Sequence, residues 1–231
     1  SNTAVGYSAL GNSSPTTGPN NVAMGFAAGA AITNGSGNIC IGAGAANSTN
    51  LLTSGQNNIV IGLNARTNSA STNNAIVMGE AVGGQANNNF SFGDGTTDSN
   101  IVFGATSITA PSDQRYKEEI TDSTAGLAFI KDLRPVTFKW KKEKDVPTNS
   151  DSYVEGSDKR VMNCDENVMH GFIAQEVKTA IDNHSEIKDG FRMWAESDNA
   201  DKRQRLAPSE LIPMLVKAIQ ELEARIATLE G

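Results

Sequence analysis

Asn58-Ile59-Val60-Ile61-Gly62 is the stretch that decides how the first half of this chain folds. It places large apolar residues at alternate positions and ends on glycine, which is typical of a short strand that leaves through a sharp corner. The pattern occurs seven times before residue 112, and its glycines lie 11 to 20 residues apart. In chain order the copies are NTAVG (2–6), NVAMG (21–25), NICIG (38–42), NIVIG (58–62), AIVMG (75–79), NFSFG (89–93) and NIVFG (100–104).

Copies of this length predict a solenoid, because a five-residue strand cannot bury its apolar face alone whereas stacked strands can. We expect the alternating pair of each copy, such as Ile39 and Ile41, to form the buried face. The Asn that opens six copies suits a turn and can form a ladder between coils, and the fifth copy has Asn74 one place early. Cys40 is interpreted as a small packing residue. A disordered linker is the alternative for so polar a segment, and seven phased apolar pairs disfavour it.

The composition changes abruptly within Ala110–Ile120, which reads APSDQRYKEEI. Residues 112–231 contain 41 of the 45 charged side chains, and residues 1–111 contain the other four. This break predicts two domains, 1–111 and 112–231. Because the first residue is Ser and a repeat begins at once, we expect the chain to be the C-terminal piece of a longer protein.

Several classes of function are disfavoured by the bulk properties. The net charge is −7 and neither half has a basic stripe, so a nucleic-acid partner is not expected. No apolar run reaches the roughly 18 residues of a membrane span. The two cysteines, Cys40 and Cys164, form no metal or disulfide pattern, and we expect neither a metal nor a cofactor.

The second half carries the signals of a mixed α and β domain. Thr121-Asp122-Ser123 offers caps for a helix through residues 125–130, which would end near Leu133 because Pro135 follows. Val136–Trp140 alternates as a strand, and residues 141–168 are a polar excursion. The remaining expected elements are a strand that turns into a helix from 171 to about 183, and two short strands at 191–195 and 205–207 joined by an acidic hairpin.

A heptad seam of apolar residues ends the chain. Pro208 suits the first turn of a helix, and the predicted coiled coil covers residues 208–230. Ile at a with Leu at d leans towards two strands in isolated peptides, and a helix packed on its own domain is the alternative. The seam consists of Ile212, Leu215, Ile219, Leu222, Ile226 and Leu229.

Ser112 and Lys117 are the candidate catalytic pair. A serine becomes a nucleophile when a base takes its proton, and a neutral lysine can be that base. On a continuous helix the two would lie on different faces, but Lys117 could fold back if Ser112 preceded the helix. The alternative is that Ser112 or Asp113 caps a helix and Lys117 is a surface lysine. His170 and His184 have no spaced Ser or Asp partner and are interpreted as structural or exposed.

The repeats resemble the head repeats of trimeric autotransporter adhesins, in which the strand motif is followed by small residues such as Ala28, Ala45 and Ala65. That resemblance implies a left-handed parallel β-roll with three chains about one axis. The spacers here are longer and less even, and an intertwined triple β-helix is the competing geometry.

The second half resembles the intramolecular chaperone domain at the C-terminus of phage tailspikes, tail fibres and endosialidases. The resemblance is carried by Ser112-Asp113-x-Arg115-x-Lys117-x-x-Ile120, by Pro135-Val136-x-Phe138-x-Trp140, and by Gly171–Val177. It implies a trimer whose chaperone domain cuts itself off as a serine peptidase between Pro111 and Ser112. Ser112 would be the nucleophile and Lys117 the base, with Asp113 and Arg115 shaping the turn. Tyr116 stands where leucine is common.

Together these features favour the end of a phage-type fibre with a self-cleaving chaperone, assembled as a homotrimer in the host cytoplasm and carried in the virion. A host-surface receptor would be reached through the upstream fibre. One alternative is an adhesin stalk whose C-terminal domain is a permanent, non-cleaving trimerisation cap. Another is a membrane-tethered transcription factor with the same module, which the uncharged repeat disfavours.

Overall fold

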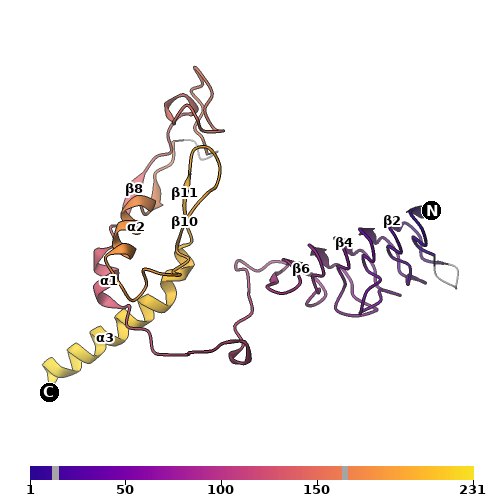
Figure 1. Ribbon diagram of the computed structural model, residues 1–231, viewed down its shortest axis with the longest axis horizontal. Coiled ribbons are helices and arrows are strands. Elements are labelled where there is room, and N and C mark those ends of the chain that lie inside the picture. Colours follow the sequence, from indigo (N-terminus) through magenta and orange to yellow (C-terminus); the bar gives the residue numbers. More distant parts are fainter. Residues whose placement is uncertain (12–15, 163–165) are drawn as a thin grey trace. The chain divides into compact units, whose positions relative to one another are not determined.

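The computed structural model describes residues 1–11, 16–162 and 166–231, so Cys164 lies outside the described residues. The chain divides into two compact units, Ser1–Glu118 and Glu119–Gly231. The first is a β-solenoid of about five turns, and the second is an α+β unit that ends in a long helix (Figure 1). Both fold types agree with the sequence analysis.

The solenoid is a parallel β-roll built by one chain. Its consecutive strands pair in parallel with matching repeat positions in register, so that Cys40 lies between Ala23 and Val60. Pairing of each strand with the next one along the same chain favours the β-roll over an intertwined triple β-helix. The parallel strands are β1 (Thr3–Val5), β2 (Val22–Met24), β3 (Ile39–Ile41), β4 (Ile59–Ile61), β5 (Ile76–Met78) and β6 (Asn89–Phe92).

The strands contribute small side chains to the interior of the roll. Cys40 is fully buried and confirms its predicted packing role; its burial raises the thiol pKa to about 12. The predicted inward face was wrong, because the flanking residues such as Ile39 and Ile41 point away from the core and are only half-buried. The narrow roll has room for one small residue per strand. The other fully buried apolar residues include Ala23, Val60 and Val77 from the strands, Ala28, Ala45 and Ala65 after the corners, and Ile32 and Leu52 from the far side.

The Asn residues that open the copies form a buried ladder. Asn38 Nδ2 donates to Asn21 Oδ1 at 3.0 Å, and Asn38 Oδ1 accepts from Asn58 Nδ2 at 2.9 Å and from the Asn58 main-chain N–H at 3.0 Å. Each rung therefore satisfies backbone groups that would otherwise be buried without partners. In the fifth copy the ladder position is Ala75, whose N–H donates to Asn58 Oδ1. Asn74 occupies the preceding positive-φ corner with φ 55°.

Gly62 shows two reasons why a corner between stacked coils needs glycine. Gly62 has a φ of 135°, and a Cβ there would lie 2.1 Å from the carbonyl oxygen of Gly79 in the next coil. An L-residue would therefore be strained and would also collide with backbone. The corner glycines set the close spacing of the stacked coils.

The seventh copy does not add a coil, which corrects the sequence prediction. β7 (Ser99–Val102) reverses and pairs antiparallel with β6, so that Phe90 faces Ile101. Only 11 residues separate Gly93 from Gly104, too few for the circuit that the longer spacers allow. The turn is closed by Asp94, whose Oδ1 accepts from the N–H groups of Thr96 and Thr97 at 2.9 and 2.8 Å. The last parallel register is therefore at β6.

The second unit has the predicted elements around one apolar core. β8 (Val136–Phe138) pairs antiparallel with β9 (Met169–Gly171), and β10 (Trp194–Glu196) with β11 (Gln204–Leu206). The helices are α1 (Leu127–Asp132), α2 (Ala174–Asp182) and α3 (Ile212–Glu230), preceded by a short 3-10 turn at Pro208–Leu211. The buried core residues are Ala125, Phe129, Val177, Ala180, Ile181, Ile187, Met193 and Leu211.

The start of α1 differs from the prediction. The helix begins at Leu127 after Gly126, and Thr121-Asp122-Ser123 lies in exposed, irregular chain before it. Glu221 of α3 accepts from the Leu127 N–H at 2.9 Å. A side chain 94 residues away thus replaces the predicted local cap.

In the described residues of the polar excursion, 141–162 and 166–168, the chain is largely irregular, as predicted. The excursion is linked by exposed ion pairs, among them Lys142 and Lys144 to Asp158 at 2.7 and 2.6 Å. Arg203 Nη2 donates to Ser150 Oγ at 2.7 Å, which connects the excursion to the β10–β11 hairpin.

Candidate functional site

A single 3-10 turn brings Ser112 and Lys117 together. Asp113 precedes the turn, which covers Gln114–Tyr116, and Lys117 follows it in an extended conformation. The ammonium of Lys117 donates to Ser112 Oγ at 2.8 Å, and both side chains are exposed. The tight turn places the two side chains in contact, whereas a continuous α-helix would have put them on different faces. If the lysine were neutral, the same contact could pass the serine proton to the amine.

Asp113 and Arg115 hold that turn in shape. Asp113 Oδ1 accepts from the Arg115 main-chain N–H at 2.9 Å, and the guanidinium Nη2 lies 2.6 Å from Asp113 Oδ2. The pKa of Asp113 is lowered by this side-chain pair and by the backbone hydrogen bond, so the carboxylate stays charged. Asp113 thereby caps the turn whose far end carries Lys117.

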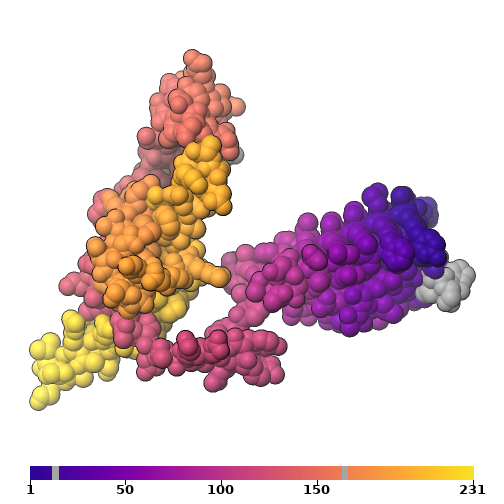
Figure 2. Space-filling view, viewed as in Figure 1, coloured from indigo at the N-terminus to yellow at the C-terminus, as the bar shows by residue number. Residues whose placement is uncertain are grey.

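The heptad seam of α3 is exposed along its length. α3 packs on its own domain through a different face, which includes the buried Ala218 and the capping Glu221. The C-terminal end of the helix projects from its domain in the space-filling view (Figure 2). The seam residues are exposed by 43 to 86%: Ile212, Leu215, Ile219, Leu222, Ile226 and Leu229.

The solenoid has a second exposed apolar surface, which the sequence analysis missed. It consists of outward strand residues and of the large apolar residues that follow three of the corner glycines, Tyr7, Phe26 and Leu63. Tyr7 and Phe26, both of the latter kind, stack with ring centroids 5.6 Å apart. The sequence held a signal for this surface in the middle position of each strand copy. A core made of Ala, Cys and Val at that position leaves no room for the larger flanking side chains, which must therefore face outward. Members exposed by 41 to 76% are Val5, Tyr7, Met24, Phe26, Leu63 and Met78.

The two histidines differ in their surroundings. His184 is a structural residue: its ring contacts Phe129, and its nitrogens lie 2.8 Å from Asp132 Oδ2 and 3.0 Å from Glu186 Oε1. His170 is exposed on β9. Within the described part of the chain, no group of three or more His, Cys, Asp or Glu could hold a metal ion. None of the described helices is both long and apolar enough to cross a membrane.

Residues 112–186 match the model of a peptidase family that is described as the chaperone of endosialidase. The match begins at Ser112 and includes Lys117, and it confirms the resemblance that the second half of the sequence indicated. No curated protein and no solved structure matches the chain.

Proposed function

We propose that this chain is the C-terminal part of a phage-type tail fibre or spike, in which residues 112–231 guide assembly of the β-roll and then cut themselves off before Ser112. One observation carries the proposal. The family match begins at Ser112, and the Lys117 amine lies 2.8 Å from the Ser112 hydroxyl. The chain would act once on itself and on no outside substrate.

The reaction needs only groups of this chain and water. Lys117, as the neutral amine, accepts the Ser112 Oγ proton while Oγ bonds to the carbonyl carbon of Pro111. Backbone N–H groups stabilise the oxyanion. The bond between the Pro111 carbon and the Ser112 nitrogen then breaks, the nitrogen takes the proton, and an ester remains. Water hydrolyses the ester to a Pro111 carboxylate and a free Ser112 hydroxyl.

The active form proposed is a homotrimer. Two apolar surfaces, the α3 seam and the outward face of the solenoid, lie exposed on the single chain and would be covered by further copies. Both families that the sequence resembles are trimeric, whereas the Ile and Leu seam alone leans towards two strands.

The domain would act before the fibre is complete. Joining three C-termini through α3 raises the effective concentration of the attached β-rolls, which lowers the entropic cost of bringing three solenoids into register. Once the domain is removed, the fibre would persist through a high unfolding barrier. We therefore expect residues 1–111, expressed alone, to be insoluble or monomeric, and the cleaved fragment to be a heat-resistant trimer that does not refold. Normal assembly of residues 1–111 alone would contradict the chaperone role.

Cleavage is tested on a denaturing gel with intact-mass measurement. The wild-type chain should yield two fragments, the second starting at Ser112. Ser112→Ala and Lys117→Ala should each abolish cutting and leave the oligomer intact. Lys131→Ala, which removes an exposed lysine of α1, is the matched control and should cut normally. Cutting at another bond, or in Ser112→Ala, would overturn the dyad.

Assembly is tested by light scattering at micromolar concentration. The full chain should have the mass of three copies, and Ile219→Asp in the exposed seam should reduce it. Glu223→Asp, an exposed conservative change on the same helix, should not. A monomeric or dimeric wild type would contradict the trimer.

A permanent trimerisation cap on an adhesin stalk is the second candidate. The solvent exposure of Ser112 and Lys117 favours it, because a non-cleaving domain has no need to enclose them. An uncleaved wild-type trimer would support this alternative. Under the first proposal the protein belongs in the virion, is assembled in the host cytoplasm, and takes part in host attachment through the upstream fibre.

A further inference from the structure

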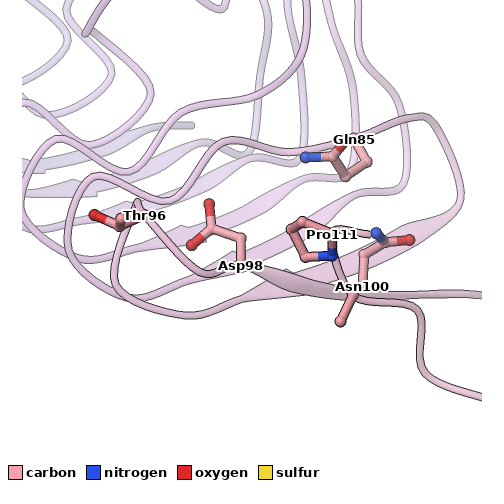
Figure 3. A pocket seen from close by; sticks show the side chains of 6 residues that line it. Gln85, Thr96, Asp98, Asn100 and Pro111 are labelled. Carbon is pink, nitrogen blue, oxygen red and sulfur yellow. The ribbon is translucent and has the colours of Figure 1, made fainter. Parts of the chain in front are cut away.

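A hollow of about 360 Å³ lies at the closed end of the solenoid, where β7 pairs antiparallel with β6 (Figure 3). Its volume is within the range of about 300 to 1,000 Å³ that small-molecule sites occupy. All of its lining belongs to the first compact unit and precedes Ser112 in the chain. The residues that line it are Gln85, Thr96, Asp98, Asn100, Ala110 and Pro111.

Asp98 supplies a carboxylate in a fixed orientation. Its Oδ1 accepts from the Gly95 N–H at 2.8 Å, and its Oδ2 accepts from the Gly83 N–H at 3.3 Å. Each carboxylate oxygen has a second lone pair, which remains able to accept a hydroxyl hydrogen from a ligand. Because Asp98 is half-buried, such a hydrogen bond is stronger than it would be at a fully exposed carboxylate.

The wall formed by β7 and the residues that follow it is held as well. The Asn100 N–H donates to the Thr109 carbonyl at 2.9 Å, and the Thr109 N–H donates back to the Asn100 carbonyl at 2.7 Å. This bridge fixes the start of the short segment that leads to Ala110 and Pro111. Proline has a fixed φ, and the residue before it is restricted to extended conformations. A ligand therefore meets a preformed wall, and few torsions have to be ordered on binding.

The hollow also contains amide and hydroxyl groups with unused hydrogen-bonding capacity. Gln85 Nε2 donates to the Gly83 carbonyl at 3.3 Å, and Asn100 Oδ1 accepts from the Asn89 side chain at 3.3 Å. These contacts orient both amides and leave Gln85 Oε1 as an acceptor and Asn100 Nδ2 as a donor. Among the residues that the structure describes, neither of these two atoms has a partner. Thr96 is exposed, and its hydroxyl can both donate and accept.

This lining selects against several classes of ligand. Of the described residues that line the hollow, Asp98 alone is charged, so phosphate, sulfate and other anions lack a positive partner. None of the same described residues has an aromatic or large aliphatic side chain that would bury a lipid or a flat ring system. A divalent cation is disfavoured, because it needs about six oxygen ligands and the carboxylate already accepts two N–H groups. A neutral ligand that is dense in hydroxyl groups fits the donors and acceptors that are present.

We propose that the hollow binds one neutral sugar residue of a host-surface glycan. Asp98 and Gln85 Oε1 accept hydrogens from sugar hydroxyls, and Asn100 Nδ2 donates to a sugar oxygen. The Pro111 ring covers an apolar C–H face of the sugar. The inference rests on the proposed fibre function, and adds the class of receptor and the place where the fibre meets it. Because cutting before Ser112 makes Pro111 the last residue, the hollow lies at the C-terminal end of the remaining fibre.

The first test is a titration of the full chain with monosaccharides, followed by saturation-transfer NMR. The probes are the methyl glycosides of glucose, galactose, mannose and N-acetylglucosamine, with that of glucuronic acid as the anionic counterpart. At least one neutral sugar should bind with a Kd of about 1 to 10 mM, as expected for a ligand of this size. The glucuronide should bind at least about 5-fold more weakly than the best neutral sugar, because its carboxylate is repelled by Asp98.

Two double variants assign the binding to the hollow. Gln85→Ala with Thr96→Val removes an amide and a hydroxyl of the lining and should weaken binding by about 10-fold or more. Gln56→Ala with Thr49→Val removes the same groups at exposed positions elsewhere in the solenoid and should change the Kd by less than about 2-fold. Strand circular dichroism should be unchanged in both, so a loss of binding cannot come from a misfolded roll.

Three results would overturn the site. They are no binding of any neutral sugar, equal affinity in the two double variants, and a glucuronide that binds as tightly as the best neutral sugar. Ser112→Ala, which should stay uncut, contains the whole lining and should bind the same sugar as the wild type. Binding by the cut form alone would also overturn the site, because the residues before Ser112 would then not suffice.

The denaturing gel and the titration together identify which proposal fails. If the wild type cuts before Ser112 and no sugar binds, self-cleavage stands and the sugar site is wrong. If the wild type stays uncut while a sugar binds and the lining variant loses it, the site stands and the proposed self-cleavage is wrong.

Discussion

The two units of this chain bury opposite kinds of residue. The strands of the solenoid bury small side chains, and a row of buried asparagines, such as Asn38 and Asn58, satisfies the backbone of the next coil. The second unit buries large residues such as Phe129 and Met193, and leaves its charged pairs at the surface. Stability in the solenoid therefore comes from one contact repeated between neighbouring coils. Stability in the second unit comes from contacts that each occur once.

The range of these contacts also differs. The ladder hydrogen bonds join residues 17 to 20 apart, so each coil needs only the one before it. The cap on α1 joins residues 94 apart and needs the whole unit to be folded. The difference indicates that adding coils within one chain is easy. Under the proposed function, the costly step that a chaperone would help with is the meeting of three chains in register.

The largest effect is expected at a corner of the solenoid. Gly62→Ala introduces both a positive-φ strain and a backbone clash with Gly79, and should destabilise the solenoid by about 4 kcal/mol or more. Gly104→Ala, where φ is 87° and a Cβ meets nothing, should cost only about 1 to 2 kcal/mol. Thermal loss of strand circular dichroism measures both. Equal losses would show that φ alone, and not close stacking, requires the glycine.

Asn58→Ala should have the next largest effect. It removes hydrogen bonds to the Thr72 carbonyl and Asn38 Oδ1 and leaves the buried Ala75 N–H unpaired, at a cost of about 3 kcal/mol. Asn73→Ala is the control, because Asn73 Oδ1 likewise accepts from a main-chain N–H of a neighbouring coil, that of Gln56, but Asn73 is only half-buried; it should cost less than about 1 kcal/mol. Tryptophan emission should stay unchanged, since Trp140 and Trp194 are both in the second unit. If Asn58→Ala leaves the stability of the solenoid unchanged, the asparagine ladder does not stabilise it.

Glu221→Ala should have a moderate effect confined to the second unit. The loss of its hydrogen bond to the Leu127 N–H should cost about 1 kcal/mol, as the loss of a helix cap does. Glu223→Ala, at an exposed position of α3, should be within about 0.5 kcal/mol of wild type. Unfolding followed by tryptophan emission gives both values. If the two variants lose the same stability, the long-range cap does not stabilise α1.

The smallest effect is a dependence on pH, also in the second unit. The pKa of His184 is raised by hydrogen bonds to Asp132 and then to Glu186. The stabilisation that protonated His184 gives the folded state should be fully present below the pKa of histidine in the unfolded chain, about 6.5. It should be lost as the pH rises through the raised pKa of the folded state. The melting temperature of the wild type, followed by tryptophan emission from pH 5.5 to 8.5, should therefore fall as the pH rises. The fall should be smaller in His184→Gln. His170→Gln, at an exposed site, should show the same fall in melting temperature as the wild type. If the fall disappears in this variant, the pH dependence belongs to His170 and not to His184.

The sequence by itself determined the local features. The phased glycines predicted a solenoid, the charge boundary at Ser112 predicted a second domain, and the heptads predicted a terminal helix. Ser112 and Lys117 could be named as a pair because motif residues close in sequence are read directly. These features depend on the backbone preferences of single residues and on the spacing of apolar residues. Both can be read from a few consecutive positions.

Tertiary structure decided what depends on distant neighbours. The narrow interior turned Ile39 and Ile41 outward, because which face of a short strand is buried is set by the space between the walls of the roll. The reversal of β7 followed from the length of a turn and its capping by Asp94. The start of α1 followed from Glu221, 94 residues away. For Ile39, Ile41 and the start of α1, the deciding atoms belong to another element, and a local pattern does not show where that element will pack. The β7 reversal depends instead on the short turn beside the strand, whose effect the repeat pattern does not show.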